Sequence, residues 1–270
     1  MKRAKAPQSN DSGKSPSEEI DTSPSKRPRK VTAQEGAERK LRKLLTTDVD
    51  FLVEPQSEYA LRTELKEEGG VTESALREAL AAFLNRGSLE STGQGIRRPR
   101  LEVPDVIVRF QERLSFEKIA IMRRHAVNPS MRAGASGALV GIAAQQAKLA
   151  ASNDLDDRVQ WFCLSVEFHS SLLRHAGIGE LVTDLQNLMW RIRFAARFPL
   201  EDAQTRESVA KDHMRIAKEL LTVDDWDRYW SMHKNEHIKK PLGRALKQLF
   251  SIDDVEPYWA MTLELAGEQS

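Results

Sequence analysis

Two histidines in the C-terminal half of the sequence, a residue type that can bind metal ions, fall on apolar helical faces. His169 shares a helical face with the apolar residues three, four and seven positions later, and His233 follows two tryptophans by three and seven positions. Both imidazoles therefore point toward a core. Imidazole nitrogen is a common ligand of transition metals, although a single inward histidine is more often a hydrogen-bonded core residue.

A charged pair, Arg113 and Glu117, falls on or beside an apolar helical stripe. The two residues are four positions apart, so they share one helical face. Burial of a charge is costly unless an opposite charge matches it. Two explanations stay open: a structural ion pair, which the spacing favours, or an arginine that binds an anionic ligand. The stripe is formed by Val106, Phe110, Leu114 and Ile121.

Other residues could contact nucleic acid. Arg77 and Ser74 lie on the polar face of a helical segment, and three arginines follow a glycine-containing turn at positions 97, 98 and 100. Arginine binds phosphate oxygens and the edge of guanine. Arg97, Arg98 and Arg100 could instead be ordinary solvated surface.

The elements that carry these DNA-binding candidates are three short helices and a hairpin, in residues 34–101. Leucines at helical spacing mark the first helix, Ser57 begins the second, and Thr72 is placed to cap the third, which Gly87 ends. Two glycines between short β-compatible pieces then predict a hairpin. Three helices followed by a hairpin are typical of a winged helix-turn-helix, whose third helix enters the major groove of DNA.

Residues 102–270 are expected to form an all-α helical bundle. Pro104 suits a first helical turn, and breaks fall near 127–136, 152–156, 199–202, 222–224 and 251–256. No strand-like alternation occurs there, so we predict six or seven helices. The predicted fold class is therefore mainly α, with an N-terminal winged helix-turn-helix followed by an all-α domain.

Residues 1–33 are rich in Ser, Pro, Lys and Asp and nearly free of large apolar side chains. Such a segment cannot bury enough surface to fold, so we expect a disordered tail. Its basic stretch, residues 25–30, could be a solubilising tail, an arm that binds DNA phosphates, or a nuclear-localisation patch.

Composition narrows the class of protein. The single cysteine excludes an intramolecular disulfide and fits a reducing compartment, and no apolar run approaches the length of a membrane span. We therefore expect a cytoplasmic protein without membrane contact. The net charge of +1 does not by itself indicate a nucleic-acid binder.

Residues 57–90, SEYALRTELKEEGGVTESALREALAAFLNRGSLE, resemble the DNA-binding segment of the GntR family of transcription regulators. The most specific part is GVTESALREAL, residues 70–80. Members commonly contact DNA through three arginines, and only Arg77 is present here. Tyr59 and Glu73 occupy the other two positions, so the operator sequence should differ from the family norm. A glutamate can accept a hydrogen bond from cytosine N4.

The C-terminal part resembles the FCD domain, the effector-binding half of the FadR subfamily of GntR regulators. The resemblance rests on three segments in order: ERLSFEKIA (112–120), VEFHSSLLRHAGIGELVTDL (166–185) and DHMRIAKEL (212–220). Many FCD domains bind a divalent metal through one aspartate and three histidines. The resemblance makes His169 the first histidine and His213 the second, but Ser165 stands where the family has aspartate.

The third metal ligand is ambiguous, since the family's usual interval ends at Asn235. We predict His233, because Thr222 and Asp225 form a capping pair that starts the last helix early. His237 shares that stripe, one turn further out. The expected site is thus His169, His213 and His233 with Zn²⁺, Ni²⁺ or Mn²⁺, and the alternative is a metal-free cavity.

Together these features predict a homodimeric DNA-binding transcription regulator and not an enzyme. The resemblance implies a double-stranded, palindromic operator and a small carboxylate effector, bound near Arg113 and Ser165. Two alternatives are a constitutive dimeric DNA-binding protein with a degenerate effector site, and a metal-dependent hydrolytic enzyme. Such an enzyme would need a carboxylate as general base, and none is evident in the sequence.

Overall fold

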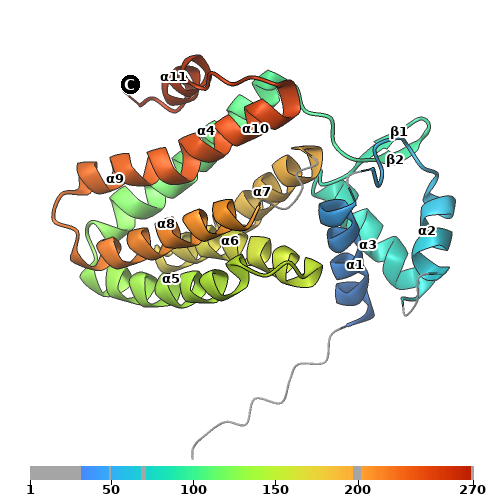
Figure 1. Cartoon of the computed structure of the whole chain (residues 1–270), viewed down its shortest axis with the longest axis horizontal. Coiled ribbons are helices and arrows are strands. Elements are labelled where there is room, and N and C mark those ends of the chain that lie inside the picture. Colours follow the sequence, from blue (N-terminus) through green and yellow to red (C-terminus); the bar gives the residue numbers. More distant parts are fainter. Residues whose placement is uncertain (1–31, 49, 68–70, 197–201, 269–270) are drawn as a thin grey trace, which may run out of the picture. The chain divides into compact units, whose positions relative to one another are not determined.

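The computed structural model describes residues 32–48, 50–67, 71–196 and 202–268 (Figure 1). The expected tail, including its basic stretch at 25–30, lies outside these residues except for its last two positions. Thr32 is the N-cap of the first helix, through a reciprocal capping box with Glu35, and Ala33 is the first residue of that helix.

Three helices and a hairpin open the described chain: α1 (Ala33–Thr47), α2 (Glu58–Glu67), α3 (Glu73–Asn85), β1 (Glu90–Thr92) and β2 (Gly95–Arg97). Thr72 caps α3 by accepting a hydrogen bond from the backbone N–H of Ala75, as predicted. The leucine faces of α1 to α3 share one buried core. This arrangement is a winged helix-turn-helix.

The wing is an antiparallel pair in which Glu90 faces Arg97 and Thr92 faces Gly95. Gln56, just before α2, extends it through two backbone hydrogen bonds to Ile96, at 2.9 and 2.7 Å. The approach is so close that a Cβ at Gly95 would lie 2.2 Å from the carbonyl oxygen of Gln56. Gly95 also has a φ of 137°, which favours glycine.

The remaining described elements are helical: α4 (Val103–Lys118), α5 (Pro129–Ala150), α6 (Leu155–His175), α7 (Val182–Ala196), α8 (Ala203–Thr222), α9 (Trp226–Lys234), α10 (Lys240–Phe250) and α11 (Glu256–Leu265). A π-helical segment, Asn235–Lys239, joins α9 to α10 without a break. Another, Ile119–His125, extends α4. The mainly α fold class with an all-α second part is therefore confirmed.

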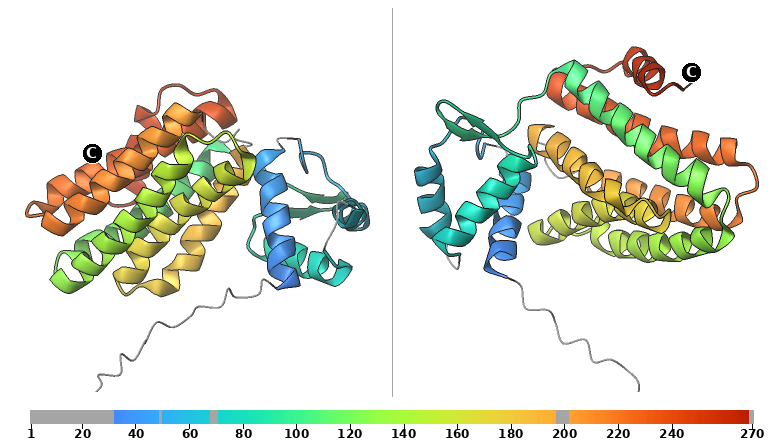
Figure 2. Two further views of the ribbon diagram at one scale, coloured as in Figure 1. Left: turned by 60° about the horizontal axis from the view of Figure 1, so that its bottom comes forward. Right: turned by 180° about the vertical axis from the view of Figure 1, so that it is seen from behind.

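α5 packs along both α6 and α8, while α4 contacts α7, α10 and α11 (Figures 1 and 2). One expected boundary is wrong. Thr222 is the last residue of α8 and does not cap the next helix; the Asp225 carboxylate does so by accepting from the backbone N–H of Arg228. No helix in the described ranges is long and apolar enough to cross a membrane.

Gly95→Ala should lower the free energy of unfolding by about 1–3 kcal/mol from the φ strain alone, and the clash with Gln56 should add to that loss. Gly93→Ala is the matched control, because a Cβ added at Gly93 would meet no atom within 4 Å. Chemical denaturation of both variants measures the difference. Equal stabilities would contradict the close approach of the wing to residue 56.

Candidate functional site

A fully buried carboxylate, Glu117 on α4, is the centre of the candidate site. The Nε of Arg113, one helical turn earlier, donates a hydrogen bond of 2.7 Å to Oε1 of Glu117. Both side chains are buried, with side-chain exposures of 6% and 0%. The ion pair favoured from the spacing is therefore confirmed.

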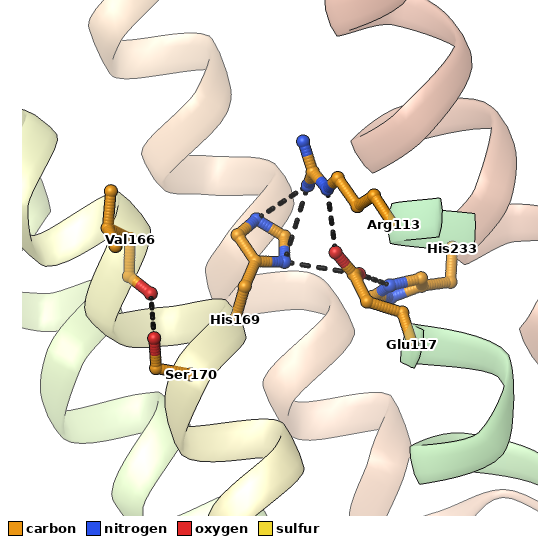
Figure 3. Close-up of polar contacts among 6 residues, drawn as sticks. All are labelled: Arg113, Glu117, Val166, His169, Ser170 and His233. Carbon is orange, nitrogen blue, oxygen red and sulfur yellow. Dashed lines mark hydrogen bonds and ion pairs between the residues drawn. The ribbon is translucent and has the colours of Figure 1, made fainter. Parts of the chain in front are cut away.

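Two histidines from other helices complete the contacts of Glu117. Nδ1 of His169, on α6, lies 3.2 Å from Oε2, and Nε2 of His233, on α9, contacts the same oxygen (Figure 3). Nη2 of Arg113 lies 3.0 Å from Nε2 of His169. Because arginine can only donate, His169 accepts at Nε2 and donates from Nδ1 to the carboxylate.

The charges of this group follow from burial and pairing. Burial alone would raise the pKa of Glu117, but the neighbouring His169 and the Arg113 guanidinium hold it well below its usual value. Burial lowers the pKa of His169 to about 4. Glu117 is thus ionised and His169 neutral at pH 7, and the charge that matches the carboxylate is that of Arg113.

His213, on α8, and His237, in the π-helical segment, lie on the other side of His169. Their rings stack at 4.7 Å, and Phe168 stacks on His213 at 4.0 Å. Gln146 contacts Nδ1 of His213 through its side-chain oxygen, which leaves Nε2 of His213 for another partner. Burial lowers the pKa of both histidines well below the ordinary value, so both are neutral ligands.

The described residues therefore offer two three-ligand groups, and His169 belongs to both. One is His169, His213 and His237; the other is Glu117, His169 and His233. Within each group, one ligand atom per residue lies within 4.8 Å of the others. Three neutral imidazoles converging at this spacing are a donor set that zinc and similar divalent ions accept.

The expected set of His169, His213 and His233 is not one of these groups. His233 is buried but contacts Glu117, and His237 takes the place beside His213. Residues four apart share one helical face, so His233 and His237 both point inward, and Glu117 occupies His233. Asn235, the other candidate, is exposed.

Sequence reasoning missed two members of the site. It treats Glu117 only as the partner of Arg113, and it places His237 a turn too far out. The spacing could have predicted both residues, since Glu117 shares a helical face with Arg113 and His237 shares one with His233, four residues earlier. Ser165 is buried one turn before His169, so α6 supplies no carboxylate at that position.

A pocket of about 780 Å³, including space open to solvent, adjoins this cluster. Arg113, Ser165, His169, His213 and His237 line it together with apolar residues of α4, α6 and α7. Asp212 and Glu236 also line it, and both contact Arg215 and Lys240, which balance their charges. The pocket can therefore receive a small molecule beside Arg113 and the histidines.

The residues predicted to bind DNA lie on the winged helix-turn-helix, away from this pocket. Arg77, Ser74 and Glu73 are exposed on α3, and Tyr59 is 75% exposed on α2. Nη1 of Arg62 pairs with Glu73 at 3.0 Å, which partly offsets the negative charge on this face.

The three arginines that follow the turn differ from one another. Arg100 is exposed, with a side-chain exposure of 62%, and pairs at 3.9 Å with the exposed Glu54, whereas Arg97 pairs with Glu90 across the hairpin. The prediction for Arg98 as a DNA contact needs correction, because this side chain is only 4% exposed. Its guanidinium donates hydrogen bonds to four backbone carbonyls, those of Leu45, Asp48, Phe51 and Phe194.

Comparison with known proteins supports the fold. No protein-family model matches the sequence, and no curated protein matches it. The structure of E. coli McbR/YncC matches with a TM-score of 0.59 at 13% identity, over 81% of this chain and 99% of that one. A second match is Lar, which controls the expression of the Listeria monocytogenes agr system and mediates virulence; its TM-score is 0.51 at 16% identity, over 80% and 97% of the two chains.

At these identities the likeness shows a shared fold. It confirms the architecture that the sequence resemblance implied, a winged helix-turn-helix followed by a helical domain.

Glu117→Gln should lower the free energy of unfolding by about 3–5 kcal/mol, because it leaves the buried Arg113 without its counter-charge. Glu112→Gln on the same helix is the control, since Glu112 pairs with Arg109 in a partly exposed position and should lose at most about 1 kcal/mol. Denaturant titration of both variants gives the comparison. A Glu117→Gln protein as stable as the wild type would show that the buried pair does not form.

Proposed function

We propose that the protein is a DNA-binding transcription regulator whose affinity for its operator changes when a small carboxylate binds in the helical domain. One observation carries this proposal: a winged helix-turn-helix with an exposed, polar third helix is joined to a helical bundle that has a pocket over buried arginine and histidines. The resemblance to GntR regulators and the fold shared with Lar support it.

α3 is the helix proposed to enter the major groove. Arg77 and Ser74 would reach base edges from its exposed face, with Glu73 available to cytosine and Tyr59 to the backbone. Arg100, and Arg97 once released from Glu90, would contact phosphates next to the groove. The palindromic operator and the homodimer follow from the usual two-fold symmetry of such regulators.

Arg77→Ala should weaken operator binding by about 1–3 kcal/mol, as expected for loss of one good base contact. Arg174→Ala on α6 is the control, because Arg174 is exposed outside the winged helix-turn-helix and pairs with Glu167 of its own helix. Electrophoretic mobility shift at fixed salt, with a fragment selected from random DNA, measures both. Equal affinity of Arg77→Ala and wild type would remove α3 from the proposed interface.

His169, His213 and His237 would hold a divalent metal ion, with Zn²⁺, Ni²⁺ and Mn²⁺ as candidates. The ion would take the lone pair of His169 Nε2 in place of the hydrogen bond from Arg113, while Nδ1 keeps its bond to Glu117. The donor set supports this, because all three imidazoles are neutral and Gln146 orients His213. A bound ion would offer an open coordination position to a carboxylate oxygen. Arg113 and Ser165 line the same pocket and would orient the effector.

Elemental analysis should find up to one divalent metal per chain in protein purified without chelator or histidine tag. His237→Ala and His213→Ala should lose it, whereas Asn235→Ala should retain it because Asn235 is exposed. Ser165→Asp should tighten binding by adding an anionic oxygen one turn before His169.

His233→Ala distinguishes the two three-ligand groups. Metal retained in His233→Ala but lost in His237→Ala places the ion among the three histidines, and the opposite pattern places it at Glu117. A wild type and a Ser165→Asp variant that both lack metal would reject the metal site.

α7 is proposed to couple the effector pocket to the winged helix-turn-helix. Its Trp190 lies 4.8 Å from the guanidinium of Arg42 on α1, and its Phe194 stacks at 6.0 Å on Phe83 of α3. The carbonyl of Phe194 also accepts a 3.1 Å hydrogen bond from Arg98. Four other residues of the same helix line the pocket: Leu188, Met189, Ile192 and Arg193.

A hydrolytic enzyme is less consistent with the site. Glu117 is a carboxylate near the histidines, but its lowered pKa and its bond to Arg113 make it a weak general base. A constitutive DNA-binding protein differs from the proposal in one measurable property. Its operator affinity would not respond to any carboxylate.

A further inference from the structure

We propose that the effector is an aryl-substituted monocarboxylate, with a carboxylate at one end and a ring-sized apolar body at the other. This inference rests on the proposed function and specifies the ligand class of the same pocket. It follows from the order in which the pocket-lining residues occur along their helices.

The inner end of the pocket holds its anion-binding groups. Arg113, His169, His213 and His237 line it, and each is at most 5% exposed. Ligand atoms of the three histidines lie within 4.8 Å of one another, and Arg113 lies 3.0 Å from His169. A carboxylate is the small anionic group that pairs with a guanidinium, and its second oxygen would face the histidines.

Each helix becomes less polar one turn away from this cluster. Ser165 precedes His169 by four residues on α6, Val209 precedes His213 by four on α8, and Pro241 follows His237 by four on α10; all three line the pocket. Phe110 similarly precedes Arg113 by three on α4. The Ser165 hydroxyl is the one polar group of these four, so the middle of the pocket suits a hydrocarbon.

Two turns from His169 the wall is aromatic. Trp161 lies eight residues before His169, which corresponds to about 12 Å along a helix. Phe162 beside it packs edge-on against Trp190 at 4.8 Å and under Arg193 at 4.7 Å. Leu188, Met189 and Ile192 complete the apolar side from α7.

The length and the polarity of the pocket determine which carboxylates fit it. A propanoate or lactate would occupy the inner end alone and leave the aromatic wall without a contact. A second carboxylate, as in succinate, would be placed one turn from the cluster, against Val209, Pro241 or Phe110. The other two pocket-lining arginines are Arg193 on α7 and Arg244 on α10, and Arg244 follows His237 by seven residues, about two turns, so the short succinate chain would not reach it. A phenyl ring on a short chain reaches the wall and contacts Trp161 and Phe162.

Isothermal titration of the full chain, as purified without chelator, tests the inference with 3-phenylpropanoate, propanoate, lactate and succinate. We expect 3-phenylpropanoate to bind at least tenfold more tightly than the other three, and to alter operator affinity. Val209→Phe, which fills the middle of the pocket, should reduce its affinity at least tenfold. Val108→Phe, on the exposed side of α4, should leave it unchanged.

Each result decides between the inference and the function on which it rests. If lactate, propanoate or succinate binds as tightly as 3-phenylpropanoate and alters operator affinity, the aryl inference is overturned and the regulator remains. If Val209→Phe keeps a wild-type melting temperature and full affinity for 3-phenylpropanoate, the ligand does not pass through the middle of the pocket, and the aryl inference is overturned. If no carboxylate binds or changes operator affinity, the proposed effector response fails as well.

Discussion

The helical domain is organised around one buried negative charge. A carboxylate removed from water is strongly destabilising unless opposite charge and hydrogen-bond donors surround it. Glu117 meets this requirement with Arg113 from its own helix, His169 from α6 and His233 from α9. Three helices distant in sequence must therefore converge at one point. The pocket exists beside that point because the same convergence brings α8 and α10 close.

The charges of this centre cancel among its own residues, so an anionic ligand would depend on an ion held by the histidines. Glu117 and Arg113 cancel each other, and the histidines are neutral because burial lowers the pKa values of His169, His213 and His237. Ser165 adds no charge where an aspartate would have added one. A divalent ion held by the three histidines would keep its whole charge, and a ligand carboxylate would be the nearest group able to reduce it.

Local patterns were sufficient to predict the elements but not the assembly of the site. The cap at Thr72, the stop at Gly87 and the leucine stripes depend on neighbouring residues, so the winged helix-turn-helix followed from the sequence. His233 and His237 share one helical face, so periodicity directs both inward but does not choose between them. The difference comes from Glu117 on α4, which contacts His233 and is distant in sequence. Arg98 was expected at the surface because its neighbours are charged. Four backbone carbonyls, brought together from distant parts of the chain, instead hold it inside.

The π-helical segment Asn235–Lys239 also determines how the gene can change without loss of the fold. A π turn contains one residue more than the α turn it replaces, so deletion of one codon there would restore a regular α-helix. The residues after the segment would keep their faces of the helix, because the π turn already absorbs the extra residue. Leu242, Ala245 and Leu246 would therefore stay buried. The same deletion in a regular α-helix would rotate every later residue by about 100°. A length polymorphism is thus tolerable at this segment as it is in a loop, provided that the codon lost is that of the exposed Asn235 and not that of the buried His237.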